Sequence, residues 1–254
     1  MTTESSGLLV AGDLYMDRLS SDGTGNGFLP VSNATQMALQ QEIEFQDLIS
    51  RRKDTRGQLL ASVAIPQPGE INLSLNEINR DNLAMALLGD TESLDVAAET
   101  FTDEAVTLKG YNWTEIGHRN LKSEDLTVEK DATTLVKGTD YEVNFRLGLI
   151  RGLRGSEELT GEGDELTISG ETNALTGSRI RGAVRPQIRA RLMLDGRNMV
   201  NDRPVIVTVD EALIRPTEAV DFLSEEFVSV PMTGRMRTLP GKTSPFTVEM
   251  VDAD

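Results

Sequence analysis

The sequence predicts a mainly β fold for its 254 residues, and three observations support this. Polar and apolar side chains alternate along several short segments, which is the pattern of a strand with one buried and one wet face. Glycine (22 residues) and proline (nine) are spread between these segments, where turns are expected. No stretch is as long and apolar as a membrane-spanning helix, which needs about 18 such residues. The length allows one large domain or two smaller ones.

The clearest alternation lies in residues 36–46, where apolar side chains at odd positions are separated by polar ones. It returns in residues 70–76, so both segments are predicted to be strands with one wet face. Between them lie a charged segment, residues 50–57 (SRRKDTRG), and a second apolar run, residues 59–65. This order predicts a long hairpin loop with a charged tip.

A short helix is predicted immediately after these strands. Apolar side chains recur at helical spacing in Leu83, Ala84, Leu87 and Leu88. Asn79 is a suitable N-cap, Asp81 places a carboxylate in the first turn, and Gly89 is a suitable C-terminal stop. The strands are therefore expected to lead directly into one helix.

Toward the N-terminus, residues 8–19 predict a first strand and residues 20–27 (SSDGTGNG) a flexible turn. The turn has part of the EF-hand spacing, but its twelfth position is Asn33, where a bidentate Glu is required, and no helical pattern flanks it. A loop is therefore favoured over a calcium site. Beyond the helix, residues 90–103 are acidic and predict an irregular segment.

The middle region, residues 104–170, is rich in strand patterns. Within it, residues 139–150 predict a strand, a turn near Gly148 and a second strand, and residues 153–165 predict a loop rich in Gly and Glu. No linker isolates this region. Residues 1–254 are therefore interpreted as a single domain with a β-rich insertion at about 104–170, and a separate module stays open as the alternative.

The C-terminal third resumes the alternation. Residues 188–194 and 205–209 predict a hairpin, and residues 217–222 predict a helical turn. The side chains expected to face inward from that turn are Val220, Phe222 and Leu223. Residues 227–232 predict a last internal strand, and residues 240–254 a tail that can add an edge strand.

The charge balance is strongly acidic, with 25 basic and 41 acidic residues and a net charge of −16. This opposes ordinary wrapping of DNA, because neutralising phosphates requires Lys and Arg. Solubility is the simpler explanation of the charge. The arginines are unevenly distributed, however. Those that crowd residues 179–203 are Arg179, Arg181, Arg185, Arg189, Arg191, Arg197 and Arg203, and such a basic band suggests contacts between subunits.

No catalytic, cofactor-binding or metal-binding residue is predicted. The chain has no Cys, which excludes disulfides, thiolate zinc sites and thiol nucleophiles. Its one histidine, His118, lies beside Arg119 in a polar turn, where a structural role is favoured. Trp113 and Tyr111 could stack on a sugar, although core packing is favoured. Aromatic residues make up only 4% of the chain, a low share that suggests neighbouring copies complete the burial.

Several segments, taken in order, carry a resemblance to a known family. They are residues 12–18 (GDLYMDR), residues 27–45, the hairpin tip, residues 71–89 (INLSLNEINRDNLAMALLG), residues 139–150 (TDYEVNFRLGLI) and residues 191–209. In this order the chain resembles the tail tube (major tail) proteins of phages with long, non-contractile tails. The resemblance covers most of the chain, least clearly residues 90–135. It implies a non-enzymatic, tail-tube-type β-sandwich or barrel with a short flanking α-helix and a long hairpin loop.

In that family six copies close into a ring around an inner β-barrel, and rings stack into a hollow tube that conducts DNA from capsid to host cell. On this resemblance, the polar sides of the strands at 36–46 and 70–76 are expected to face the bore. The predicted lumen-lining residues are Gln40, Glu42, Glu44, Gln46, Asn72 and Ser74. An acidic bore repels phosphates, so that DNA slides through it. An ordinary solvated strand face is the alternative.

The hairpin tip is the second expected contact. Stacked rings of an acidic chain repel one another, and a basic tip would offset that repulsion. The predicted inter-ring stacking residues are Arg51, Arg52, Lys53, Asp54 and Arg56. Glu92, Asp95 and the loop at 157–164 are candidate partners in the adjacent ring, and a mobile solvated loop is the simpler alternative.

The resemblance also implies partners and a location. The partners are other copies of the chain, a tape-measure protein, and tail terminator and tail-tip or distal tail proteins. DNA is only passing cargo, and neither a membrane nor a cofactor is expected. Residues 1–12 lack the basic start of a secretory signal, so assembly is expected in the bacterial host cytoplasm and the final location in the virion tail. The alternatives are a distal tail or decoration protein with the same fold, and a monomeric β-sandwich module for carbohydrate binding or adhesion.

Overall fold

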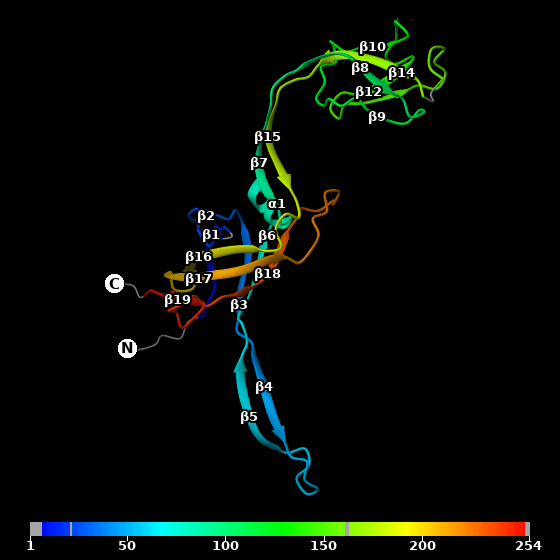
Figure 1. Ribbon diagram of the computed structural model, residues 1–254. Coiled ribbons are helices and arrows are strands. Elements are labelled where there is room, and N and C mark those ends of the chain that lie inside the picture. The colour runs from blue at the N-terminus through cyan, green and yellow to red at the C-terminus, as the bar shows by residue number, and fades with distance from the viewer. Residues whose placement is uncertain (1–6, 21, 161–162, 252–254) are drawn as a thin grey trace. The chain divides into compact units, whose positions relative to one another are not determined.

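The fold is mainly β, as the sequence predicts, with one short helix. The residues that the computed structural model describes are 7–20, 22–160 and 163–251. Their strands form several sheets, none of which closes into a barrel within the described chain. The chain divides into two compact units, Met1–Thr91 with Ile180–Asp254, and Glu92–Arg179. The second unit contains the β-rich segment 104–170 (Figure 1).

The first unit is built on an antiparallel sheet of eight strands. Their bounds are β1 (Val10–Leu19), β2 (Leu29–Pro30), β3 (Ala34–Gln40), β6 (Glu70–Leu75), β16 (Ile188–Asn198), β17 (Arg203–Pro216), β18 (Val230–Met236) and β19 (Phe246–Met250). Seven follow the order β2–β1–β16–β17–β18–β6–β3. The eighth, β19, pairs with the first half of β17, and β18 pairs with the second half. The predicted C-terminal hairpin and the predicted edge strand in the tail are therefore both confirmed.

The strand predicted at 70–76 is β6, and its predicted apolar face packs in the core. Ile71, Leu73 and Leu75 are 0 to 2% exposed, whereas the residues between them stay half-exposed. Burying one such side chain stabilises the fold by about 1.5–3 kcal/mol. The helix α1 (Arg80–Ala86) adds Met85 to the same core.

The helix begins as predicted and ends differently. Asn79 is the N-cap, and its side-chain oxygen accepts a hydrogen bond from the Asn82 amide at 2.8 Å. At the other end Leu88, not Gly89, adopts the left-handed conformation, with φ of 48°. Gly89 is needed for space instead, because a Cβ there would lie 2.5 Å from the carbonyl oxygen of Arg181.

The second unit has a core of its own. Its strands are β8 (Thr100–Thr107), β9 (Thr114–Glu115), β10 (Thr127–Lys130), β11 (Thr133–Thr134), β12 (Tyr141–Asn144), β13 (Leu149–Gly152) and β14 (Glu165–Glu171). They form two sheets, in the orders β11–β10–β14–β8 and β12–β13–β9. Val128 and Ile168 of the first sheet share one buried cluster with Tyr141 and Ile150 of the second, as expected for a β-sandwich.

Two further two-stranded sheets complete the fold. β7 (Asp90–Val96) pairs with β15 (Leu175–Arg181), and β4 (Ile43–Ile49) pairs with β5 (Leu59–Pro66). Figure 1 shows β4 and β5 as a hairpin that continues from β3 and returns to β6. The predicted single strand at 36–46 is therefore wrong. It is divided at Gln41 and Glu42 into β3, which belongs to the main sheet, and β4, which does not.

Other predictions also require correction. Residues 90–103 are not irregular, since they form β7 and the start of β8. Residues 217–222 form no helical turn, and Phe222 and Leu223 are 69% and 92% exposed instead of facing inward. A single turn of helix needs tertiary packing to persist, and here only Val220 packs on the core. Residues 252–254 of the predicted tail lie outside the described residues.

Candidate assembly surface

The hairpin of β4 and β5, together with its tip at 50–58, is called the arm below. Every residue of both strands is exposed. Its large apolar side chains, between 39% and 65% exposed, are Ile43, Phe45, Leu48, Ile49, Leu59, Leu60, Val63 and Ile65. A lone two-stranded hairpin is marginally stable in water, and an uncovered apolar patch of this kind marks an interaction surface. The arm is therefore the candidate site of contact with another molecule.

The two faces of the arm are not divided into one polar and one apolar side. Glu44 lies opposite Ile65, and Gln46 lies opposite Val63. Side chains of opposite residues point to the same face, so apolar groups of β5 surround the polar groups of β4. Phe45 lies on the other face. The face predicted to be polar in residues 36–46 is therefore mixed in the arm, because apolar side chains of β5 share it with the polar side chains of β4.

The tip is held in a defined conformation by backbone and side-chain hydrogen bonds. The Ser50 amide donates to the carbonyl of Gln58 at 2.8 Å, and the Gly57 amide donates to the carbonyl of Ser50 at 2.9 Å. The Ser50 hydroxyl lies 2.7 Å from that of Thr55 and accepts from the Arg52 amide at 3.3 Å. Gly57 has φ of 89°, which favours glycine there. The charged side chains are thus carried by an ordered turn.

The five residues predicted to stack between rings all lie on this turn and are exposed. Within the part of the chain that the structure describes, no ion pair involves Arg51, Arg52, Lys53 or Arg56. Together with Asp54 they leave a positive tip on a chain whose net charge is −16. The positive tip can attract an acidic partner surface, and burial of the apolar side chains of β4 and β5 can then stabilise the contact.

Some of the acidic residues predicted to pair with this tip in an adjacent ring already form ion pairs within their own chain. Glu92 lies 3.6 Å from Arg179, and Asp164 is 2.8 Å from Lys130 and buried, so both already have cationic partners in their own chain. Among the described residues, Asp95 and Glu157 form no ion pair.

The six residues predicted to line a bore occupy three different places. Gln40, Asn72 and Ser74 lie on the solvent side of β3 and β6, since the alternate residues of β6 are buried. Glu42 lies in the connection between β3 and β4, and Glu44 and Gln46 lie on the arm. The structure therefore does not bring the six together on one strand.

Cationic side chains also lie on the solvent side of the main sheet, close to the predicted lining residues of β3 and β6. Arg235 pairs with Glu70, which pairs in turn with Gln40, so the three share one row. Arg215 is exposed in a second row, opposite Thr233. At the β3–β6 end of this face, the two cations offset the negative charge of Glu70 within one subunit.

The Arg-rich segment 179–203 is neutralised largely within the chain. Arg185 contacts Asp90 at 2.6 Å, and Arg189 contacts the buried carboxylate of Glu211 at 3.0 Å. Arg191 lies 3.7 Å from the buried Asp17. These arginines stabilise the first unit, and the sequence could not show it because their acidic partners are distant along the chain.

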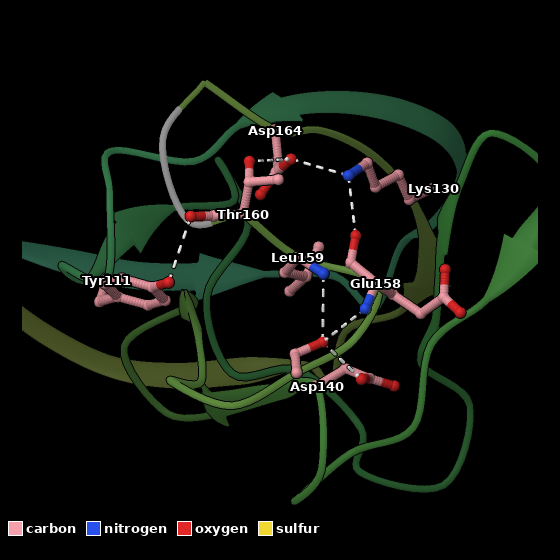
Figure 2. A network of polar contacts seen from close by, with 8 residues as sticks. Tyr111, Lys130, Asp140, Glu158, Leu159, Thr160 and Asp164 are labelled. Atoms are coloured by element: carbon pink, nitrogen blue, oxygen red, sulfur yellow. Dashed lines mark hydrogen bonds and ion pairs between the residues drawn. The ribbon is translucent and has the colours of Figure 1, made fainter.

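A polar network in the second unit holds the loop at 156–160 and Asp164, the residue before β14, as Figure 2 shows. Lys130 Nζ donates to Asp164 Oδ1 and to the carbonyl of Glu158, each at 2.8 Å. The hydrogen bond from Lys130 to Asp164 raises the pKa of the lysine. Asp140 accepts from the Ser156 hydroxyl at 2.6 Å, which lowers the pKa of this carboxyl. Each charge is engaged in holding the loop, so the network is structural.

The histidine is also engaged in packing. Its Nε2 lies 2.8 Å from Glu104 Oε1, and its ring stacks on Phe101 with centroids 4.2 Å apart. In the described part of the chain, no three His, Asp or Glu side chains are grouped so that they could hold a metal ion. The same residues include no helix of the length and apolarity that crossing a bilayer requires.

The aromatic pair considered for sugar stacking carries arginines instead. The guanidinium of Arg151 lies 4.6 Å from the ring centre of Trp113, and that of Arg154 lies 4.8 Å from the ring centre of Tyr111. Cation–π contacts of this kind occupy one face of each ring. A flat platform for a sugar ring is therefore not favoured here.

Comparison with known proteins places the chain in a family. A search of curated proteins returned no match. The model of the family described as "Protein of unknown function UCP028589" matches residues 8–245, which include the arm, the helix and the second unit. The match spans far more than half of the sequence, and the chain therefore belongs to this family.

Proposed function

We propose that the chain is a tail tube protein of a phage with a long, non-contractile tail, and that six copies form each ring of a hollow, DNA-conducting tube. The observation that carries the proposal is the arm. A nearly continuous apolar strand such as β5 is typical of strands buried on both faces, yet in the single subunit β5 is exposed along its whole length. Burial of the arm by other copies resolves this conflict.

The edge of the main sheet adds support. β3 is the last strand of its sheet in the described chain, so its outer edge has no strand beside it. Exposed edges of this kind pair readily with strands of another molecule. Pairing between copies would extend the sheet around a ring and produce an inner barrel without edges.

In this proposal the bore receives polar side chains from β3, β6, the connection to the arm and the base of the arm next to that connection. Gln40, Asn72 and Ser74 supply uncharged groups, and Glu42 with Glu44 supply negative charge. An acidic and neutral lining holds phosphates weakly, which suits passage of DNA. A tape-measure protein before ejection and the terminator and tail-tip proteins at the ends of the tube complete the proposed set of partners.

Electron microscopy and sedimentation of the purified chain test the proposal. We expect hollow tubes of constant diameter with six subunits per ring, and a reconstruction with Glu42 and Glu44 at the inner wall. A single closed ring that never stacks would instead indicate a distal tail component. Particles that stay monomeric at every concentration and in the presence of tail tips would indicate a binding module and contradict the proposal.

A further inference from the structure

A second uncovered apolar surface lies around the turn between β16 and β17, and we call it the end patch. Its members, between 43% and 66% exposed, are Leu8, Leu9, Met199, Val200, Met250 and Val251. The Met199 amide donates to the carbonyl of Leu9 at 2.7 Å, and the Val251 amide donates at 3.1 Å to that of Pro204, near the start of β17, so the members lie at the same end of the sheet. The patch ends at β19, a strand with one unpaired edge in the described chain.

Next to the end patch, acidic side chains line up across the sheet. Asp13 of β1 is opposite Asp195 of β16, which is opposite Ile206 of β17, which is opposite Glu249 of β19. Opposite residues share a face, so the three exposed carboxylates form what we call the acidic row. Within the described residues none of them has an ion pair. Asp13 and Asp195 are like charges directly opposite each other, and their repulsion lowers the stability of the free subunit.

The arm has the complementary properties in a similar arrangement. Its positive tip adjoins the exposed side chains of Leu48, Ile49, Leu59 and Leu60, as the acidic row adjoins the end patch. A seven-residue strand extends about 23 Å, so the tip can reach another molecule. Apolar surface faces apolar surface, and cations face unpaired carboxylates, when the two sites are brought together.

We infer that the arm of one copy docks on the end patch and acidic row of a second copy. This deepens the proposed function, on whose self-assembly it rests, by naming the receiving surface. The contact joins two different surfaces of the same chain, so it repeats from copy to copy and gives a closed ring or an open stack. β4 or β5 can also pair with the free edge of β19, which covers one exposed edge on each copy.

Two charge-reversed variants test the inference. The tip variant carries Arg51→Glu and Arg52→Glu, and the row variant carries Asp195→Lys and Glu249→Lys. Each alone presents like charges at both surfaces, so we expect at least a tenfold loss of sedimenting assemblies. An equimolar mixture restores opposite charges at every contact, and we expect it to assemble as strictly alternating copies.

A matched control reverses two exposed acids of the second unit, Glu157→Lys and Glu158→Lys. We expect this control to assemble like the wild type, and thermal unfolding verifies that every variant is folded. Assembly of the row variant alone, failure of the mixture, or loss of assembly in the control would overturn the inference. Hollow tubes combined with any of these results would leave the tail function standing. Assemblies that obey the charge pattern without forming tubes would support the docking contact and contradict the tail function.

Discussion

Replacing Phe45 with Ser should weaken assembly while leaving the stability of the subunit almost unchanged. The side chain is 65% exposed, and a phenylalanine buries roughly 200 Å² in a full contact, so about 130 Å² remains to be covered by a neighbour. At about 25 cal/mol per Å² this amounts to about 3 kcal/mol per contact, or roughly a 100-fold change in association constant. The free energy of unfolding of the subunit should change by less than about 0.5 kcal/mol.

Leu73→Ala is the matched control, because Leu73 is 2% exposed in the core of the same unit. It should cost about 2–5 kcal/mol of stability in the subunit. Critical concentration from sedimentation and unfolding in urea separate the two effects. If Phe45→Ser lowered stability as much as Leu73→Ala, the arm would be packed within its own subunit. An unchanged critical concentration would show that Phe45 contributes to no interface.

Three further changes have signs fixed by the structure. Asp195→Lys removes the like-charge pair across β1 and β16 and should raise the free energy of unfolding of the subunit by about 0.2–1 kcal/mol in urea. Gly148→Ala should lower the stability of the second unit by about 2 kcal/mol or more in thermal unfolding, since φ is 68° and a Cβ would lie 1.6 Å from the His118 carbonyl oxygen. The lowered pKa of Asp140 means that its ionised form stabilises the fold fully above about pH 4 and that this contribution is lost as the pH falls through the lowered pKa. Asp140→Asn should therefore reduce stability at pH 7 and flatten the acid dependence, as followed by the fluorescence of Trp113, the single tryptophan.

The sequence predicted the parts of the fold that depend on local patterns. Alternation located β6, the hairpin of β16 and β17, and the strand pair around Gly148, and capping residues located the helix. Alternation states which side chains share a face, but not whether anything covers that face. For this reason the alternation in residues 36–46 predicted one strand through Gln41 and Glu42, although β3 and β4 belong to different sheets.

The parts that could not be predicted depend on contacts between distant residues. The acidic segment of β7 becomes a strand because β15 lies beside it, where Arg179 contacts Glu92 at 3.6 Å. The acidic row is invisible in the sequence, since its members come from three strands that only the sheet order brings together. The apolar run of β5 did carry a signal for the arm, because it lacks the alternation of a strand with one wet face.

Charge provides the control that such an exposed arm requires. Apolar strands with free edges aggregate when nothing keeps molecules apart, and a net charge of −16 supplies a repulsion that acts over long distances. The attraction between tip and row acts at contact. At physiological ionic strength the Debye length is about 8 Å, which screens the repulsion between whole subunits more than a contact at about 4 Å. Raising salt from about 0.01 M to about 0.15 M should therefore promote ordered assembly, and about 1 M salt, where the Debye length is about 3 Å, should weaken it. Light scattering across this range measures assembly. A steady fall in assembly from the lowest salt concentration upward would contradict the proposed balance between long-range repulsion and contact attraction.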